Sequence, residues 1–235
     1  MAEIVLAHGA WSSAWAWRRM APLMAAAGHR FWTPSLTGLG RRAHLASPQV
    51  DLETHIQDVL AVLETEDLRD AVLLGHSYGG MVATGVADRA RDRIARLIYL
   101  DAIAPEDGES LFDAAGTEAR AIFEARIAED GEGWRIAPNP MPPDTSPEDL
   151  AWAAPRRALQ PAETFRRKLR LRGGPLTLPI AYVYCMIAGP GDGFARFRDK
   201  ALARGWETRE IEASHNPHIT CPEALMALLD EILAG

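Results

Sequence analysis

Gly75-His76-Ser77-Tyr78-Gly79-Gly80 is the stretch of this 235-residue chain that decides its fold. It follows the apolar run Ala71 to Leu74 directly and precedes an apolar run of helical spacing. Gly-x-Ser-x-Gly between a strand and a helix is typical of a sharp, strained turn that exposes a serine hydroxyl. Its glycines are needed because side chains there would collide with the strand and the helix. The stretch predicts Ser77 as a nucleophile, and a plain glycine-rich turn is the alternative.

Short apolar runs rich in Val, Ile and Leu recur along the chain between helical patterns. This alternation is typical of a mostly parallel sheet with helices on both faces, so we predict a doubly wound α/β fold. The expected strands are Glu3 to Ala7, Phe31 to Pro34, Ala71 to Leu74, Leu97 to Leu100, Ile180 to Cys185 and Glu207 to Ile211.

Helical spacing of apolar residues predicts helices that pack on this sheet. The first of them is expected to end at Gly28, a residue that tolerates the left-handed conformation. Another begins at Asp51. The last begins with Thr220 and Glu223 at capping-box spacing and has Pro222 in its first turn.

Residues 105–178 interrupt the alternation of strands and helices. Two amphipathic stretches, Leu111 to Ile127 and Ala162 to Leu171, flank a proline-dense segment from Pro138 to Pro155. A flexible linker is the alternative, but the aromatic residues of this region supply apolar surface that has to be buried. We therefore predict a core of residues 1–104 and 179–235 and a small helical cap of residues 105–178.

Composition and charge argue against several classes of protein. Apolar residues make up 48% of the chain and charged residues 24%, as in ordinary globular proteins. The formal net charge of −7 disfavours a nucleic-acid partner. Cys185 and Cys221 form neither a disulfide framework nor a metal-binding pattern. With no targeting or membrane-spanning stretch evident, we expect a cytoplasmic protein that acts on a small molecule without a cofactor, metal or membrane.

A second turn, His8-Gly9-Ala10-Trp11, follows the first expected strand. A glycine at this place lets the backbone pass close to the turn that holds Ser77. The N–H groups of Ala10 and Tyr78 can then face a developing oxyanion. We therefore predict these two N–H groups as an oxyanion hole.

A serine nucleophile needs a histidine base, and seven histidines compete for that role. His215 follows the last expected strand, on a loop at the carboxyl edge of the sheet, where doubly wound folds bind ligands. We predict His215 as the base. His218 is the alternative, and otherwise it is expected to be a surface residue before the last helix.

The acid that orients this histidine has two candidates. Asp101 ends the strand that follows the Ser77 turn in sequence and has apolar neighbours, which isolate its charge. Asp192 lies among glycines after the strand that ends at Cys185. We favour Asp101, and Asp192 stays open.

With these residues in place the chain resembles an α/β-hydrolase of the small-esterase branch, which includes bacterial esterases, plant methyl esterases and hydroxynitrile lyases. The resemblance rests on the two turns, the segment Thr33 to Gly40, the run Tyr99 to Ala102 and the loop Ser214 to Pro217. It implies that Ser77 is the nucleophile and His215 the base, and that the insertion roofs the pocket.

Departures from the family pattern narrow the expected chemistry. Gly9 and Asn216 stand where similar hydroxynitrile lyases have a threonine and a lysine, which disfavours cyanohydrin cleavage. Ser77 stands where dehalogenases and epoxide hydrolases of this fold have an aspartate. The family usually places the acid soon after the strand Ile180 to Cys185, whereas some lipases and dehalogenases place it where Asp101 stands.

These observations together predict a cofactor-independent serine hydrolase that cleaves a small-molecule carboxylic ester through an acyl-enzyme. A lactone, amide or carbon–carbon bond hydrolase with the same residues is one alternative. A receptor of this fold that binds a small molecule without turnover is another.

Overall fold

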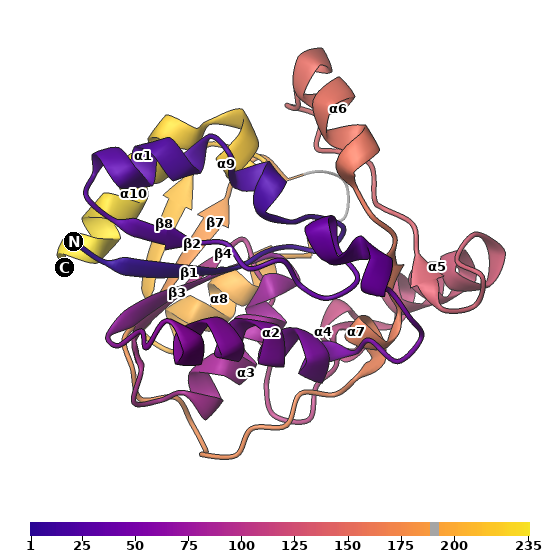
Figure 1. Ribbon diagram of the computed structural model, residues 1–235, viewed down its shortest axis with the longest axis horizontal. Helices are drawn as coiled ribbons and strands as arrows, with labels where there is room; N and C mark the ends of the chain where they lie inside the picture. Colours follow the sequence, from indigo (N-terminus) through magenta and orange to yellow (C-terminus); the bar gives the residue numbers. More distant parts are fainter. Residues whose placement is uncertain (189–192) are drawn as a thin grey trace.

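A computed structural model describes residues 1–188 and 193–235 of the chain (Figure 1). Its centre is a six-stranded sheet in the order β2-β1-β3-β4-β7-β8, in which every neighbouring pair is parallel. The strands are β1 (Glu3–Ala7), β2 (Arg30–Trp32), β3 (Ala71–His76), β4 (Ile94–Leu100), β7 (Ile180–Cys185) and β8 (Glu207–Ile211).

Helices cover both faces of the sheet. One face carries α1 (Met20–Ala26) and α10 (Pro222–Ala234), and the other carries α2 (Leu52–Thr65), α3 (Gly79–Arg89) and α8 (Ala195–Ala203) (Figure 1). Side chains alternate between the two faces along each strand, so Val5 enters one apolar core and Leu6 the other, both fully buried. The predicted doubly wound α/β fold is confirmed.

The order of the strands determines where a site can form. From β1 the chain first goes to the edge strand β2 and then returns to place β3 on the other side of β1. Ligands of such sheets bind at the carboxyl ends of the strands, where the winding direction reverses. The turns after β1 and β3 flank this point.

Several predicted boundaries were wrong. Strand β3 continues to His76 instead of Leu74, and β4 begins at Ile94 instead of Leu97. Strand β2 ends at Trp32 instead of Pro34, because only residues 30–32 pair with β1. Thr220 is not the cap of the last helix: it ends the extra turn α9 (Pro217–Thr220), where its N–H donates to the Asn216 carbonyl at 3.1 Å. Helix α10 begins after Cys221, without a side-chain cap.

Two other predicted helix ends were correct. Helix α1 is followed by Gly28 at φ +81°, in the left-handed region. Asp51 caps α2 by accepting a hydrogen bond from the Thr54 N–H at 2.9 Å.

The segment between β4 and β7 contains mostly short helices, two of which, α5 and α6, project away from the sheet (Figure 1). Its elements are α4 (Leu111–Ala115), α5 (Thr117–Glu129), β5 (Arg135–Ile136), α6 (Pro147–Ala153), the 3-10 helix η3 (Ala154–Arg156), β6 (Gln160–Pro161) and α7 (Glu163–Arg166). Two further 3-10 helices, η1 (Ala14–Trp17) and η2 (Gly40–Leu45), lie in the N-terminal part of the chain.

Of the two amphipathic stretches of this segment, the first is helical but broken in two, and the second forms less helix than its pattern predicts. The first is divided into α4 and α5 at Gly116, which has φ +89°. The second contains only the short α7, because the backbone of Leu169 instead pairs with Gly108 and Glu109 at 2.9 and 2.8 Å. The division into core and cap stays a prediction.

Within the described part of the chain, none of the helices has the length and apolar character that crossing a bilayer requires.

Candidate active site

The turn after β3 forces Ser77 into an uncommon backbone conformation, at φ +56°. Its glycines allow close contact with β1: a Cβ atom on Gly79 would lie 1.9 Å from the Ala7 carbonyl oxygen. Any larger residue at position 79 would push α3 away from the sheet. The turn therefore has the geometry of a nucleophile elbow, with Ser77 at its tip.

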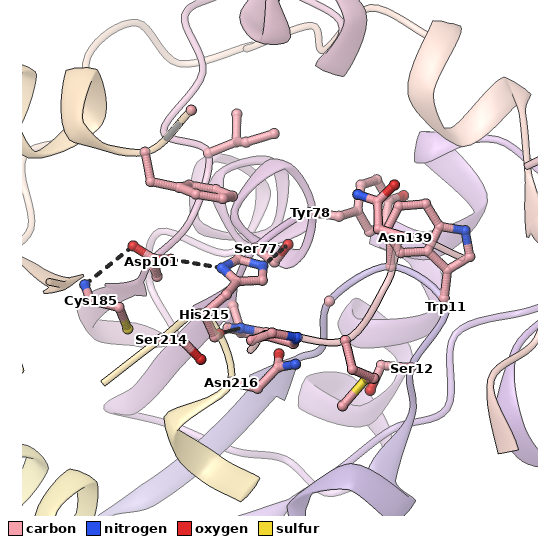
Figure 2. Close-up of a pocket in the computed structure, with 18 of the residues that line it drawn as sticks. Trp11, Ser12, Ser77, Tyr78, Asp101, Asn139, Cys185, Ser214, His215 and Asn216 are labelled. Atoms are coloured by element: carbon pink, nitrogen blue, oxygen red, sulfur yellow. Dashed lines mark hydrogen bonds and ion pairs between the residues drawn. The ribbon is translucent and has the colours of Figure 1, made fainter. Parts of the chain in front are cut away.

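Ser77, His215 and Asp101 form a continuous chain of hydrogen bonds (Figure 2). The Ser77 hydroxyl lies 2.9 Å from His215 Nε2, and His215 Nδ1 lies 2.7 Å from Asp101 Oδ2. A carboxylate only accepts, so Nδ1 carries the proton and Nε2 is free to accept from the serine. The structure thus brings together three of the residues that the sequence predicts.

Asp101 is held in place by its backbone and by its second carboxylate oxygen. It ends β4 at φ +41°, and its N–H donates to the Val183 carbonyl at 2.7 Å. The Cys185 N–H donates to Oδ1 at 3.3 Å, and the residue is only 4% exposed. A buried carboxylate with both oxygens occupied has one orientation toward His215. The alternative acid, Asp192, lies outside the described residues.

The loop that carries His215 is held from two sides. His76 Nε2 donates to the His215 carbonyl at 2.8 Å, and the Ser214 N–H donates to Asp144 Oδ2 at 3.1 Å. The ring of Phe194 stacks on His215 with centroids 4.6 Å apart. These contacts leave the His215 ring little freedom to turn away from Ser77.

The turn after β1 packs against the elbow. A Cβ atom on Gly9 would lie 2.8 Å from His76 Nδ1 and 3.2 Å from Ser77 Cβ, so glycine is required there. Within residues 1–188 and 193–235, no hydrogen bond uses the N–H of Ala10 or Tyr78, and both residues line the cavity above Ser77. These two donors are therefore available to an oxyanion.

Gln160 fixes the same turn from the opposite side. Its Oε1 accepts from the Trp11 N–H at 3.1 Å, and Trp11 Nε1 donates to the Ile136 carbonyl at 2.9 Å. Gln160 is fully buried, and its amide also donates to Thr164. The segment between β4 and β7 thus helps to set the orientation of the peptide next to Ala10.

A cavity of about 630 Å³ lies over these residues, a size that suits a small molecule. Its walls include apolar side chains from the segment between β4 and β7 and from the rest of the chain, among them Trp15, Leu111, Phe123, Phe165 and Ile219. In the described part of the chain, no group of three or more His, Cys, Asp or Glu side chains is placed to bind a metal ion.

His218, the alternative base, does not lie on the surface as expected. It is 1% exposed and stacks on Trp17 with ring centroids 4.3 Å apart. Helix α9 turns its side chain inward, and the histidine bonded to Ser77 is His215.

Burial keeps four histidines neutral. Desolvation lowers the pKa of His218 to about 3 and the pKa values of His8 and His55 to about 4. Burial, followed by the neighbouring His218 and His215, lowers the pKa of His76 well below 6.5.

We expect the protein to lose stability as the pH falls from 6.5 to 4. In this range the unfolded chain binds protons at these four histidines and the folded chain does not, so stability is present above pH 6.5 and lost below it. Each group contributes up to about 1.4 kcal/mol per pH unit to the free energy of unfolding. Urea unfolding at a series of pH values measures the slope.

The His218→Phe substitution, which keeps a ring against Trp17, tests whether the buried histidines cause this pH dependence. The slope of the unfolding free energy against pH should become shallower by up to about 1.4 kcal/mol per pH unit, the contribution of one histidine. An unchanged slope in a folded His218→Phe protein would contradict the assignment.

A nucleophile elbow at the switch point of a doubly wound sheet, with a histidine and a buried aspartate in line, defines a hydrolase of the α/β class. The chain belongs to the alpha/beta hydrolase family, whose model matches residues 4–228. The resemblance stated from the sequence is confirmed.

Individual relatives are esterases and hydrolases of similar length. The chain is 39% identical to a carbendazim hydrolyzing esterase of Nocardioides sp., over 96% of this chain and 97% of that protein. An extracellular alpha/beta-hydrolase from a Paenibacillus species is 28% identical over 98% of each chain, with a TM-score of 0.86. A methylesterase from Arabidopsis has a TM-score of 0.74 at 23% identity, over 100% of this chain and 99% of that one, which shows the shared fold.

Sequence reasoning missed Gln160, Phe194, Asp144 and two cavity arginines, Arg126 and Arg157. Each makes its contact with a residue outside its own helix or turn, and for Gln160 and Asp144 the partner is 149 and 70 residues away in the sequence. Their positions show no periodicity or motif that could have identified them.

Proposed function

We propose that the protein is a cofactor-independent serine hydrolase that cleaves small-molecule carboxylic esters through an acyl-enzyme. The observation that carries this proposal is the hydrogen-bonded chain from Ser77 through His215 to Asp101 beneath a cavity of small-molecule size. Membership of the family and the 39% identical esterase support the same activity.

In the first half of the reaction, Ser77 Oγ attacks the ester carbonyl carbon while its proton passes to His215 Nε2. Asp101 stabilises the imidazolium that forms. The N–H groups of Ala10 and Tyr78 donate to the oxyanion of the tetrahedral intermediate. The intermediate collapses to the acyl-enzyme when the proton on Nε2 passes to the leaving oxygen, which departs as the alcohol.

In the second half of the reaction, a water molecule takes the place that the alcohol has left and acts as the nucleophile. It gives a proton to His215 Nε2 as its oxygen attacks the acyl carbon, and the second intermediate expels Ser77 Oγ, which takes that proton back. The products are a carboxylic acid and an alcohol, and the enzyme returns to its starting state. Both halves use the same donors and the same base.

Binding without turnover is the alternative from another class, and hydrolysis of a lactone, amide or carbon–carbon bond is the alternative within the enzymes. The intact pairing of Ser77 with His215 argues for turnover over binding alone. Turnover of matched ester, lactone and amide substrates distinguishes the alternatives within the enzymes.

A fluorophosphonate probe tests the mechanism, because it modifies only an activated serine. We expect a label on Ser77, located by mass spectrometry, and hydrolysis of short acyl and aryl esters. Carbendazim belongs in the same panel, since the name of one relative refers to it. A protein that is neither labelled nor active on any ester would contradict the proposal.

A further inference from the structure

The charges around the cavity are opposite in sign to the charge of the chain. The chain has a formal net charge of −7. Among the described residues that line the cavity, however, Arg126, Arg157 and Arg196 are cationic and Asp101 is the sole carboxylate. Asp101 is already bonded to His215. The cavity therefore has an excess of positive charge.

Arg126 and Arg157 are fixed by a shared neighbour that carries no charge. Arg126 Nη1 donates to the Asn139 side-chain oxygen at 2.6 Å, and Arg157 Nη1 donates to the Asn139 carbonyl at 2.5 Å. Both arginines are partly buried. We call these two residues the arginine pair.

In residues 1–188 and 193–235, the arginine pair lacks the acidic partners that other arginines of this chain have. Arg19 Nη2 lies 2.6 Å from Asp149 Oδ1, and Arg89 Nη2 lies 2.6 Å from Glu53 Oε2. Within the described residues, neither member of the pair has a carboxylate within ion-pair distance. Burial lowers the pKa of Arg157, and no acid in the described part of the chain counteracts this. A partly buried cation without a counter-ion costs free energy, which a bound anion would offset.

The pair lies on the oxyanion-hole side of the cavity. The Arg157 guanidinium carbon is 5.9 Å from the centre of the Trp11 ring, and Trp11 follows Ala10 directly. Figure 2 shows Asn139 beside Trp11, across Ser77 from Asp101. The arginines and the N–H group of Ala10 therefore lie on the same side of the cavity, within reach of one substrate bound over Ser77.

We propose that the arginine pair binds a free carboxylate of the substrate, so that the preferred esters are half-esters of dicarboxylic acids. This inference rests on the proposed ester hydrolysis. Each guanidinium has N–H groups beyond the one used on Asn139, and its planar fork matches a carboxylate. Arg196 is exposed beside Phe197 and adds positive charge at the rim.

Matched pairs of benzyl esters test the preference. Benzyl half-esters of glutaric and adipic acid are compared with benzyl pentanoate and hexanoate, with release of benzyl alcohol followed by chromatography. We expect kcat/KM to favour each half-ester about tenfold or more over its neutral partner. High salt should reduce this ratio.

Arg157→Gln should reduce the same ratio by about tenfold, chiefly through a higher KM for the half-ester, because the contact is remote from the reacting atoms. Arg156→Gln is the matched control. Arg156 is the adjacent residue, is exposed, donates to the Trp152 carbonyl at 2.5 Å and does not line the cavity. The Arg156→Gln substitution should leave the ratio of kcat/KM between half-ester and neutral ester unchanged.

Equal kcat/KM for charged and neutral esters, or a ratio that Arg157→Gln leaves unchanged, would overturn the inference. Calorimetry on the Ser77→Ala protein separates it from the proposed function. If the wild type is neither labelled by the fluorophosphonate nor active on any ester, the proposed function fails, yet tighter binding of the half-esters than of the neutral esters would still support the arginine pair. Equal binding would overturn it.

Discussion

Replacing Ser77 with alanine is expected to abolish ester hydrolysis and fluorophosphonate labelling while the protein stays folded. The serine hydroxyl is bonded to His215 Nε2 at 2.9 Å, and it supplies the atom that the acyl group joins. Removal of such a nucleophile in a comparable triad lowers kcat by roughly 10⁶-fold. Alanine can occupy the strained turn at φ +56° as serine does, so circular dichroism should be unchanged.

Ser12→Ala is the control for this experiment. Ser12 lines the same cavity, but no hydrogen bond between it and His215 occurs in the described residues. The Ser12→Ala protein should keep its label on Ser77. Labelling that persists in a folded Ser77→Ala protein would place the nucleophile elsewhere.

The position of Ser77 could be predicted because its signal is local. The strand, the Gly-x-Ser-x-Gly turn and the helix are contiguous in the sequence, and glycine at position 79 is required by contact with Ala7 in β1. The same holds for Gly9, which packs against His76, and whose neighbour Ala10 makes no hydrogen bond through its N–H group within the described residues. A short-range pattern with a steric reason was sufficient in both cases.

The choice of the acid depends on long-range order that spacing does not reveal. Asp101 is buried because β7 pairs with β4, which brings Val183 to its N–H and Cys185 to its carboxylate. The neighbour of β4 follows from the winding of the whole chain. The role of Gln160 is even harder to predict from the sequence, because its partner Trp11 is 149 residues away.

Helix boundaries were wrong where two local signals compete. Thr220 and Glu223 have capping-box spacing, but Pro217 begins a helical turn before them, and this turn uses the Thr220 N–H. Within the first amphipathic stretch, Gly116 ends α4 even though the apolar pattern continues. In both places backbone geometry prevails over side-chain pattern.

Asp101→Asn is expected to lower kcat by about four orders of magnitude, the loss known for the same change in another serine triad. The Cys185 N–H needs an acceptor, so the amide oxygen stays on it and the amide NH₂ turns toward His215. His215 Nδ1 must then accept, which places the proton on Nε2 and leaves no base for Ser77. Asp192→Asn should cost far less. Turnover of both variants on one ester decides between the two acids, and a large loss confined to Asp192→Asn would assign the role to Asp192.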